Sequence, residues 1–141
     1  MAAFNKFETF VGDLGDKVHD LDADTLKVYL TAATPSTSLD SVKADLAEIT
    51  MTNETNHGAG GADITGVWGE ATGTGTLTAT DVTFLASGGQ VGPFQYVVLY
   101  NDTPTAPADP LIGWWDYGSS VTLNDGETFT VDFGASVLTL T

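Results

Sequence analysis

The sequence contains no cysteine and no arginine. Without cysteine, disulfide bonds and thiolate-ligated metal sites are excluded, so packing or assembly has to stabilise the fold. Positive charge is scarce as well, because four lysines stand against nineteen acidic residues and the formal net charge is −15. A charge of this size argues against direct binding of nucleic acid, whose phosphates are themselves negative.

The lysines are confined to the first third of the chain. All four of them precede residue 44, and twelve acidic residues but no basic residue follow it. The longer C-terminal part therefore carries a negative field that resists self-association unless apolar contacts or cations offset it. Solubility alone, a salty medium and an oriented position in an assembly are three interpretations of this asymmetry.

Long apolar runs are also missing. No stretch reaches the length of about eighteen apolar residues that a membrane-spanning helix needs, and the N-terminal MAAFNKFETF lacks the charged-then-apolar order of a signal peptide. We expect a protein that neither spans a membrane nor is secreted. A length of 141 residues with 42% hydrophobic content predicts a single β domain over residues 1–141.

The densest apolar stretch lies between residues 91 and 118. Residues 94–100 predict a strand that is buried on both faces, since only Gln95 is strongly polar. Prolines at 104, 107 and 110 then require a loop before residues 111–115 run back beside it. We expect an antiparallel pair, with Gly113 and Gly118 marking a bulge and a turn.

Other segments have the alternation of strands. Residues 25–31 predict a half-exposed strand. Within residues 76–86 the apolar residues change from odd-numbered to even-numbered positions, which predicts a bulge near Asp81 or two strands joined there. Residues 119–123 and 128–133 predict a hairpin around the turn sequence NDGE, and residues 137–141 a last strand. About seven strands with a short N-terminal helix predict a mainly β protein, an antiparallel β-sandwich or barrel.

Helical spacing occurs in two places. Phe4, Phe7 and Phe10 fall on one face of a helix expected over residues 3–12. This stripe is either part of the chain's own core or a candidate interface on a helical arm formed by residues 1–14. A second, short helix is expected within residues 39–49, and the glycine-rich residues 50–75 predict a long surface loop or irregular strand.

No motif predicts catalysis. Asp20, Asp22 and Asp24 have the spacing that begins a calcium loop, but Thr25 and Thr31 replace the glycine and glutamate that such a loop needs. A solvated acidic turn is the preferred interpretation. His19 and His57 are expected to be isolated surface residues, and no serine lies in a nucleophile elbow. We therefore expect no enzyme, no catalytic or metal-binding residue and no cofactor.

The large aromatic residues allow two interpretations. They are either core residues or a platform on which a carbohydrate stacks, and exposure of their rings distinguishes the two. The residues concerned are Trp68, Phe94, Trp114, Trp115 and Tyr117.

The stretches GPF at 92–94, LYND at 99–102, LIGWWDYGSS at 111–120 and DGETF at 125–129 resemble a family of small, uncharacterised virion proteins of tailed bacteriophages. The opening MAAFNKF and residues 24–34 are similar too, so the resemblance covers about half the chain. It implies a phage setting and brings no enzymatic residues.

The function expected from this resemblance is structural. The first hypothesis is a capsid decoration, or cement, protein that binds the major capsid protein or other virion proteins on the capsid surface as a homo-oligomer, with a trimer as the expected form. Synthesis would take place in the host cytoplasm. The alternatives are a tail or tail-tip component, and a carbohydrate- or host-binding module.

Overall fold

The computed structural model describes residues 2–141 and confirms a mainly β, antiparallel fold. One α-helix, one 3-10 turn and ten strands lie in the described part of the chain. Their bounds are β1 (Asn5–Lys6), α1 (Glu8–Gly15), β2 (Leu26–Thr31), the 3-10 turn (Lys43–Asp45), β3 (Ala62–Asp63), β4 (Val67–Ala71), β5 (Thr74–Thr78), β6 (Val82–Leu85), β7 (Val91–Asn101), β8 (Leu111–Leu123), β9 (Thr128–Val131) and β10 (Leu138–Leu140).

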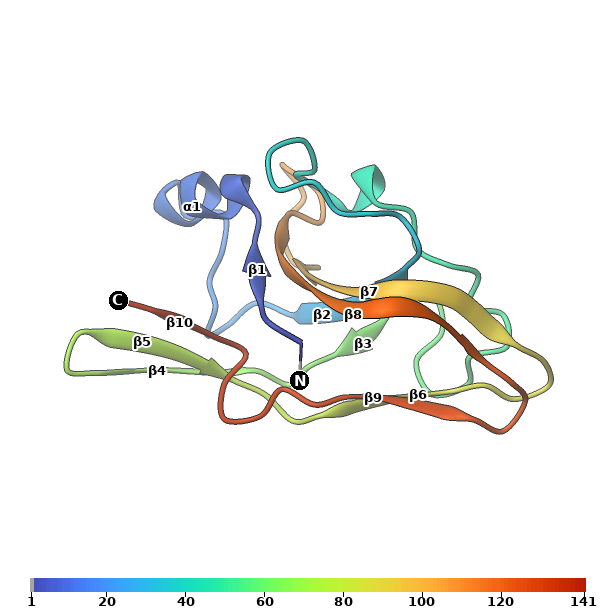
Figure 1. Cartoon of the computed structure of the whole chain (residues 1–141). Coiled ribbons are helices and arrows are strands. Elements are labelled where there is room, and N and C mark those ends of the chain that lie inside the picture. Colours follow the sequence, from blue (N-terminus) through green and yellow to red (C-terminus); the bar gives the residue numbers. More distant parts are fainter. Residues whose placement is uncertain (1) are drawn as a thin grey trace.

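The strands form two layers. One layer is a curved sheet in the order β1-β8-β7-β2-β3, and the other consists of the β10-β5-β4 sheet and the β6-β9 pair. Figure 1 shows the curved sheet above the two smaller ones, with the β4-β5 hairpin extending to the left below α1. Among residues 2–141 the strands do not close into a barrel, so the architecture is sandwich-like.

Strands β7 and β8 form the centre of the fold, as the sequence predicts. Trp115 pairs with Val97 and Trp114 with Val98, so the two tryptophans point to opposite faces of the sheet. The register of the pair shifts by three residues around Gly118 and by one residue beside Gly113. At Gly113 a side chain would collide with the ring of Phe4 and the backbone of Asn5, so only glycine fits there.

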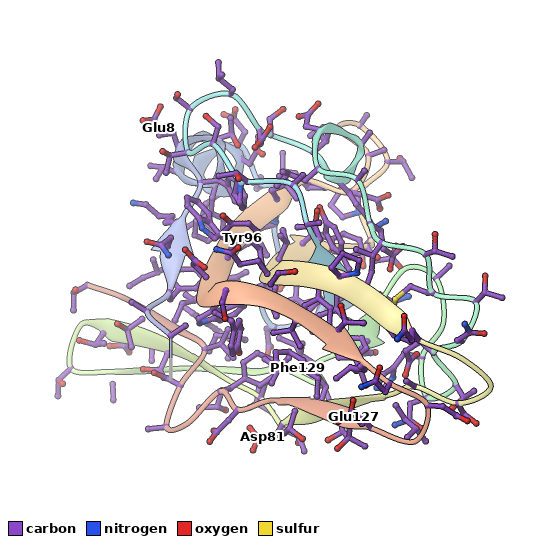
Figure 2. The ribbon with its side chains drawn as sticks, turned by 45° about the vertical axis from the view of Figure 1, so that its right-hand side comes forward. Glu8, Asp81, Tyr96, Glu127 and Phe129 are labelled. Atoms are coloured by element: carbon purple, nitrogen blue, oxygen red, sulfur yellow. The ribbon has the colours of Figure 1, made fainter. Side chains whose placement is uncertain are left out.

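The main core fills the space between the layers. Figure 2 shows Phe129 of β9 lying between the two layers, and its ring meets those of Phe94 and Tyr117, in each case with centroids 4.9 Å apart. At about 25 cal/mol per Å² of apolar surface, burial on this scale is the main stabilising term. The largest fully buried side chains of this cluster are Trp115, Phe10, Phe84, Phe94, Phe133, Leu30, Ile64 and Leu77.

A second cluster covers the outer face of the curved sheet and corrects the expectation of a half-exposed β2. Tyr29 is fully buried there with Phe7, Val98, Tyr100, Leu46 and Leu111. Its hydroxyl donates to the Leu46 carbonyl at 2.9 Å, so the segment that follows β2 folds back over the sheet. Alternation along β2 could not reveal this covering segment, because it comes from outside the strand.

The covering segment is irregular, and the helix expected within residues 39–49 is reduced to the 3-10 turn Lys43–Asp45. The Asp45 carboxylate accepts hydrogen bonds from the backbone N–H groups of Ser41 and Val42, at 2.9 and 3.1 Å. Such local bonds from an aspartate compete with helix formation. Lys43 lies over the ring of Tyr29, 4.7 Å from its centroid, and pairs with Glu48 at 3.3 Å.

The N-terminal residues pack on the chain's own sheet, which is the first of the two interpretations of the phenylalanine stripe. Phe7 and Phe10 are 0% and 1% exposed, so they are not available to a neighbouring subunit. Phe4 is half-buried with its ring on Trp115, at a centroid distance of 5.4 Å. The helix begins at Glu8 rather than residue 3, because residues 5 and 6 pair with β8 instead.

Two predictions about the C-terminal half had different outcomes. Residues 76–86 are two strands, β5 and β6, which belong to different sheets; this confirms the break expected near Asp81. The turn at 124–127 exists, with the Glu127 N–H donating to the Asn124 carbonyl at 2.9 Å, but the hairpin is wrong because β9 pairs with β6. The end of β8 is already paired with β7, Leu123 lying opposite Val91.

The glycine-rich residues 50–75 are more regular than a loop. They contain β3, β4 and the first residues of β5. A two-residue turn at Thr72 and Gly73, with φ of 50° and 85°, joins β4 to β5. None of the helices among residues 2–141 has the length and apolar character needed to cross a membrane.

Candidate interaction surface

Strand β4, at the edge of the β10-β5-β4 sheet, is largely exposed. Within residues 2–141 it pairs on one side only, with β5. Four of its five residues are exposed, and Val67 is 62% exposed. Edge strands are commonly protected by proline, by lysine or another charged side chain, or by a bulge; β4 has no proline, lysine or bulge, and Glu70 is its one charged residue. This edge is open for another strand.

The hairpin geometry determines which backbone groups face the open edge. Positive φ at both turn residues is typical of a type I′ turn, whose flanking residues Ala71 and Thr74 form a hydrogen-bonded pair. Hydrogen-bonded and non-hydrogen-bonded pairs alternate from there along an antiparallel ladder. Gly69 and Val67 therefore bond to β5, whereas Trp68 and Glu70 direct their N–H and C=O groups outward.

Trp68 lies on the inner face of this sheet, where its indole covers Gly75 of the neighbouring strand. A side chain at Gly75 would collide with the six-membered ring of the indole, so glycine at this position fixes the indole against the sheet. Glu70 is on the same face, two residues along β4. Its carboxylate accepts a hydrogen bond from the Gly73 N–H at 2.6 Å and so supports the turn.

A groove of about 440 Å³ lies between this inner face and the segment that follows α1. Its volume is within the usual range of ligand-binding clefts. Trp68 and Leu140 line it from the sheet, and the other lining residues come from residues 14–22. They are Leu14, Lys17, His19, Asp20, Leu21 and Asp22. The groove therefore has apolar walls and a mixed, mainly acidic rim.

The acidic rim is the segment that resembles the start of a calcium loop. Asp20 accepts hydrogen bonds from the backbone N–H groups of Asp22 and Ala23, at 3.1 and 3.0 Å. Asp24 accepts one from the Asp20 N–H at 2.9 Å. The run is therefore a hydrogen-bonded turn. In the part of the chain that the structure describes, no group of three acidic or histidine side chains is placed to hold a metal ion.

His19 forms one wall of the groove and is buried, which corrects the expectation of a surface histidine. Asn101 accepts from the Thr103 N–H through Oδ1, so its Nδ2 donates to His19 Nδ1 at 3.2 Å and to Asp24 at 2.7 Å. His19 Nδ1 is thus an acceptor, and the ring proton is on Nε2, which has no hydrogen-bond partner within residues 2–141. His57, in contrast, is exposed and lies against Phe84.

Burial lowers the pKa of His19 to about 4, although the nearby Asp24 carboxylate acts in the opposite direction. In the unfolded chain the imidazole has its ordinary pKa of about 6.5. A histidine kept neutral by the fold takes up a proton more readily when unfolded, so it favours unfolding as the pH falls from 6.5 toward 4.

We expect the free energy of unfolding to fall by on the order of 2 kcal/mol across this pH window because of His19. Urea denaturation at a series of pH values measures this. The variant His19→Gln, which has no proton to gain, should show a flatter profile between pH 6.5 and 5. An unchanged profile in the variant would mean that the imidazole is solvated in solution.

The aromatic residues named from the sequence do not form one platform. Phe94 and Trp115 are buried in the main core, and Tyr117 packs at its margin against Phe129. Trp114 lies on the opposite face, against Phe7 at a centroid distance of 4.6 Å. Trp68 lines the groove beside residues 14–22, whereas Trp115 borders a separate hollow with Phe4 and Phe133, so the structure does not bring the three tryptophans together.

Sequence reasoning missed the open edge of β4, the groove and the role of residues 14–22 in it. The alternation from residue 76 onward predicted the end of β5, but glycines in the preceding residues obscured its start and the whole of β4. Compared with known proteins, the chain matches no protein-family model, no curated protein and no solved structure.

Proposed function

We propose that the chain is a non-enzymatic structural protein of a tailed-phage virion, a capsid decoration protein that binds the head lattice as a homo-oligomer. The observation that carries this proposal is the open edge of β4 on a hairpin that extends from the sandwich. An unpaired strand of this kind offers main-chain hydrogen bonds to a neighbouring protein.

The resemblance to phage virion proteins supports the same function. Two of its stretches, GPF to LYND and LIGWWDYGSS, lie in β7 and β8, the central pair of the fold, and the WWDYG part in β8 is the most specific. The resemblance thus concerns the residues that determine the architecture. The strongly negative charge supports a role at a protein surface rather than on the packaged genome.

Co-sedimentation with undecorated heads tests the proposal. Purified protein is mixed with heads and, separately, with tails of the phage that encodes it, and the bound fraction is measured over a range of protein concentrations. We expect saturable binding to heads at a fixed ratio to the shell protein. Binding to tails alone would favour a tail component, and absence of binding to either would contradict a virion role.

A further inference from the structure

We infer that the open edge of β4 accepts an extended, lysine- or arginine-bearing segment of another protein as an additional antiparallel strand. This inference rests on the proposed function only in assigning that segment to a shell protein. It is carried by three features of the described residues: the outward backbone groups of β4, the position of Trp68 and Glu70, and the charge around the groove.

The backbone geometry sets the register of the added strand. Trp68 and Glu70 are the residues whose N–H and C=O groups point outward, so each would exchange a pair of hydrogen bonds with the residue opposite it. Residues directly opposite in an antiparallel pair also share a face. Side chains at these two partner positions would therefore lie on the inner face, beside Trp68 and Glu70.

The inner face specifies what these two partner side chains should be. The one opposite Glu70 meets a carboxylate directly and the indole of Trp68 diagonally, a setting that suits a lysine or arginine through both charge and cation–π attraction. The one opposite Trp68, two residues further along the partner, lies beside the indole of Trp68, which forms part of the groove lining and favours an apolar neighbour. The expected motif is a basic residue, any residue, then an aliphatic residue.

The surrounding charge selects a basic partner and disfavours a second copy. Segment 13–22, which borders the groove, contains Asp13, Asp16, Asp20 and Asp22 but only one lysine, Lys17. A second copy would bring a net charge of −15 to this acidic edge, so a homo-oligomer would have to form through another surface. An edge whose one charged residue is Glu70 can therefore remain free in solution and still pair with a positively charged segment.

A pair of designed peptides tests this inference. One is a blocked peptide of sequence TKTVTKTVT, and its matched control TETVTETVT carries glutamate in place of lysine. Amide exchange and chemical-shift changes followed by NMR show where each peptide binds. We expect the basic peptide alone to slow exchange of the Trp68 and Glu70 N–H groups, with an affinity at least about tenfold higher than that of the acidic peptide.

Two substitutions at one position separate the backbone from the charge. Glu70→Pro removes the outward N–H together with the carboxylate while leaving the backbone bonds to β5, and it should abolish binding; the loss beyond that of Glu70→Gln is the contribution of the N–H. Glu70→Gln keeps the N–H and should weaken binding about fivefold to tenfold. Val67→Thr, on the opposite face, serves as the control and should bind like the unchanged protein.

Equal binding of the two peptides, protection at other residues, or undiminished binding by Glu70→Pro would overturn the inference. The amide spectrum of each variant shows whether the hairpin is intact. The proposed function and this inference can fail separately. If the peptides bind to β4 but the protein does not bind to heads, the proposed function is contradicted and this inference stands. Heads that bind Glu70→Pro normally would contradict the inference and leave the proposed function standing.

Discussion

Replacing Trp115 with alanine is expected to lower the free energy of unfolding by roughly 3–5 kcal/mol. Trp115 is the largest fully buried side chain of the described residues and is 1% exposed. Its ring contacts Phe4 and Phe133, with centroids 5.4 and 5.7 Å away. These neighbours come from both ends of the chain, Phe4 just before β1 and Phe133 after β9 with its N–H bonded to Asp81 at 2.9 Å, so they cannot both collapse into the space left by the indole.

The neighbouring residue provides a matched control. Trp114 has the same side chain on the same strand, but it is half-buried on the outer face against Phe7. Trp114→Ala should cost less, about 1–2 kcal/mol, because less apolar surface is lost from the interior. Urea denaturation of both variants measures the difference. Equal costs, or no loss for Trp115→Ala, would contradict the division of the sheet into an inner and an outer face.

The sequence predicts the centre of this fold because the information there is local. The run from Phe94 to Tyr100, the prolines after it and the return through Trp114 and Trp115 specify an antiparallel pair without reference to other segments. The change of the apolar residues from odd-numbered to even-numbered positions near Asp81 likewise predicts a break. The structure shows this break, with β5 and β6 in separate sheets.

The incorrect predictions concern choices between distant segments. The turn at Asn124 to Glu127 has strong hairpin chemistry, yet β9 leaves β8 and joins β6 on the opposite layer. Tyr29 alternates as an exposed residue would, yet a segment beyond the strand covers it. Local propensity identifies turns and strands, but it does not identify which edge a strand will pair with.

The candidate surface was unpredictable for the same reason. The groove is lined by residues from α1, the acidic turn, β4 and β10, which are brought together only by folding. In the sequence, Trp68 is an aromatic residue within the glycine-rich residues 50–75. Those glycines have specific structural functions, since Gly75 accommodates the indole and Gly73 closes the turn that leaves β4 at an edge.

A second large effect is expected at Glu54, whose buried carboxylate organises the segment before β3. It is 4% exposed and accepts four backbone hydrogen bonds, from Asn56 and Leu85 at 3.0 Å and from His57 and Gly58 at 2.7 Å. Burial would raise the pKa of Glu54, but these four N–H donors outweigh it and hold the pKa below its ordinary value. The carboxylate thus joins a loop to β6.

Glu54→Gln should lower the free energy of unfolding by roughly 2–4 kcal/mol at neutral pH. Glutamine has nearly the same shape, but one oxygen acceptor becomes an NH₂ group that faces N–H donors, and the charge that strengthens the remaining bonds is lost. Because the folded pKa is lowered, the stabilisation is complete above the ordinary carboxyl pKa and is lost as the pH falls through the folded value. The difference between the unchanged protein and the variant should therefore shrink on acidification.

Urea denaturation of both proteins at pH 7 and pH 3 measures this difference. Glu127→Gln is the matched control, since Glu127 is exposed and accepts a single backbone hydrogen bond, from Asn124 at 2.7 Å. We expect it to cost less than about 1 kcal/mol. If Glu54→Gln were as mild as Glu127→Gln, or if its cost were the same at both pH values, the four N–H donors could not be stabilising a buried charge. The loop would then have to be held to β6 by its backbone bonds alone, such as that from the Thr55 N–H to the Leu85 carbonyl at 3.1 Å.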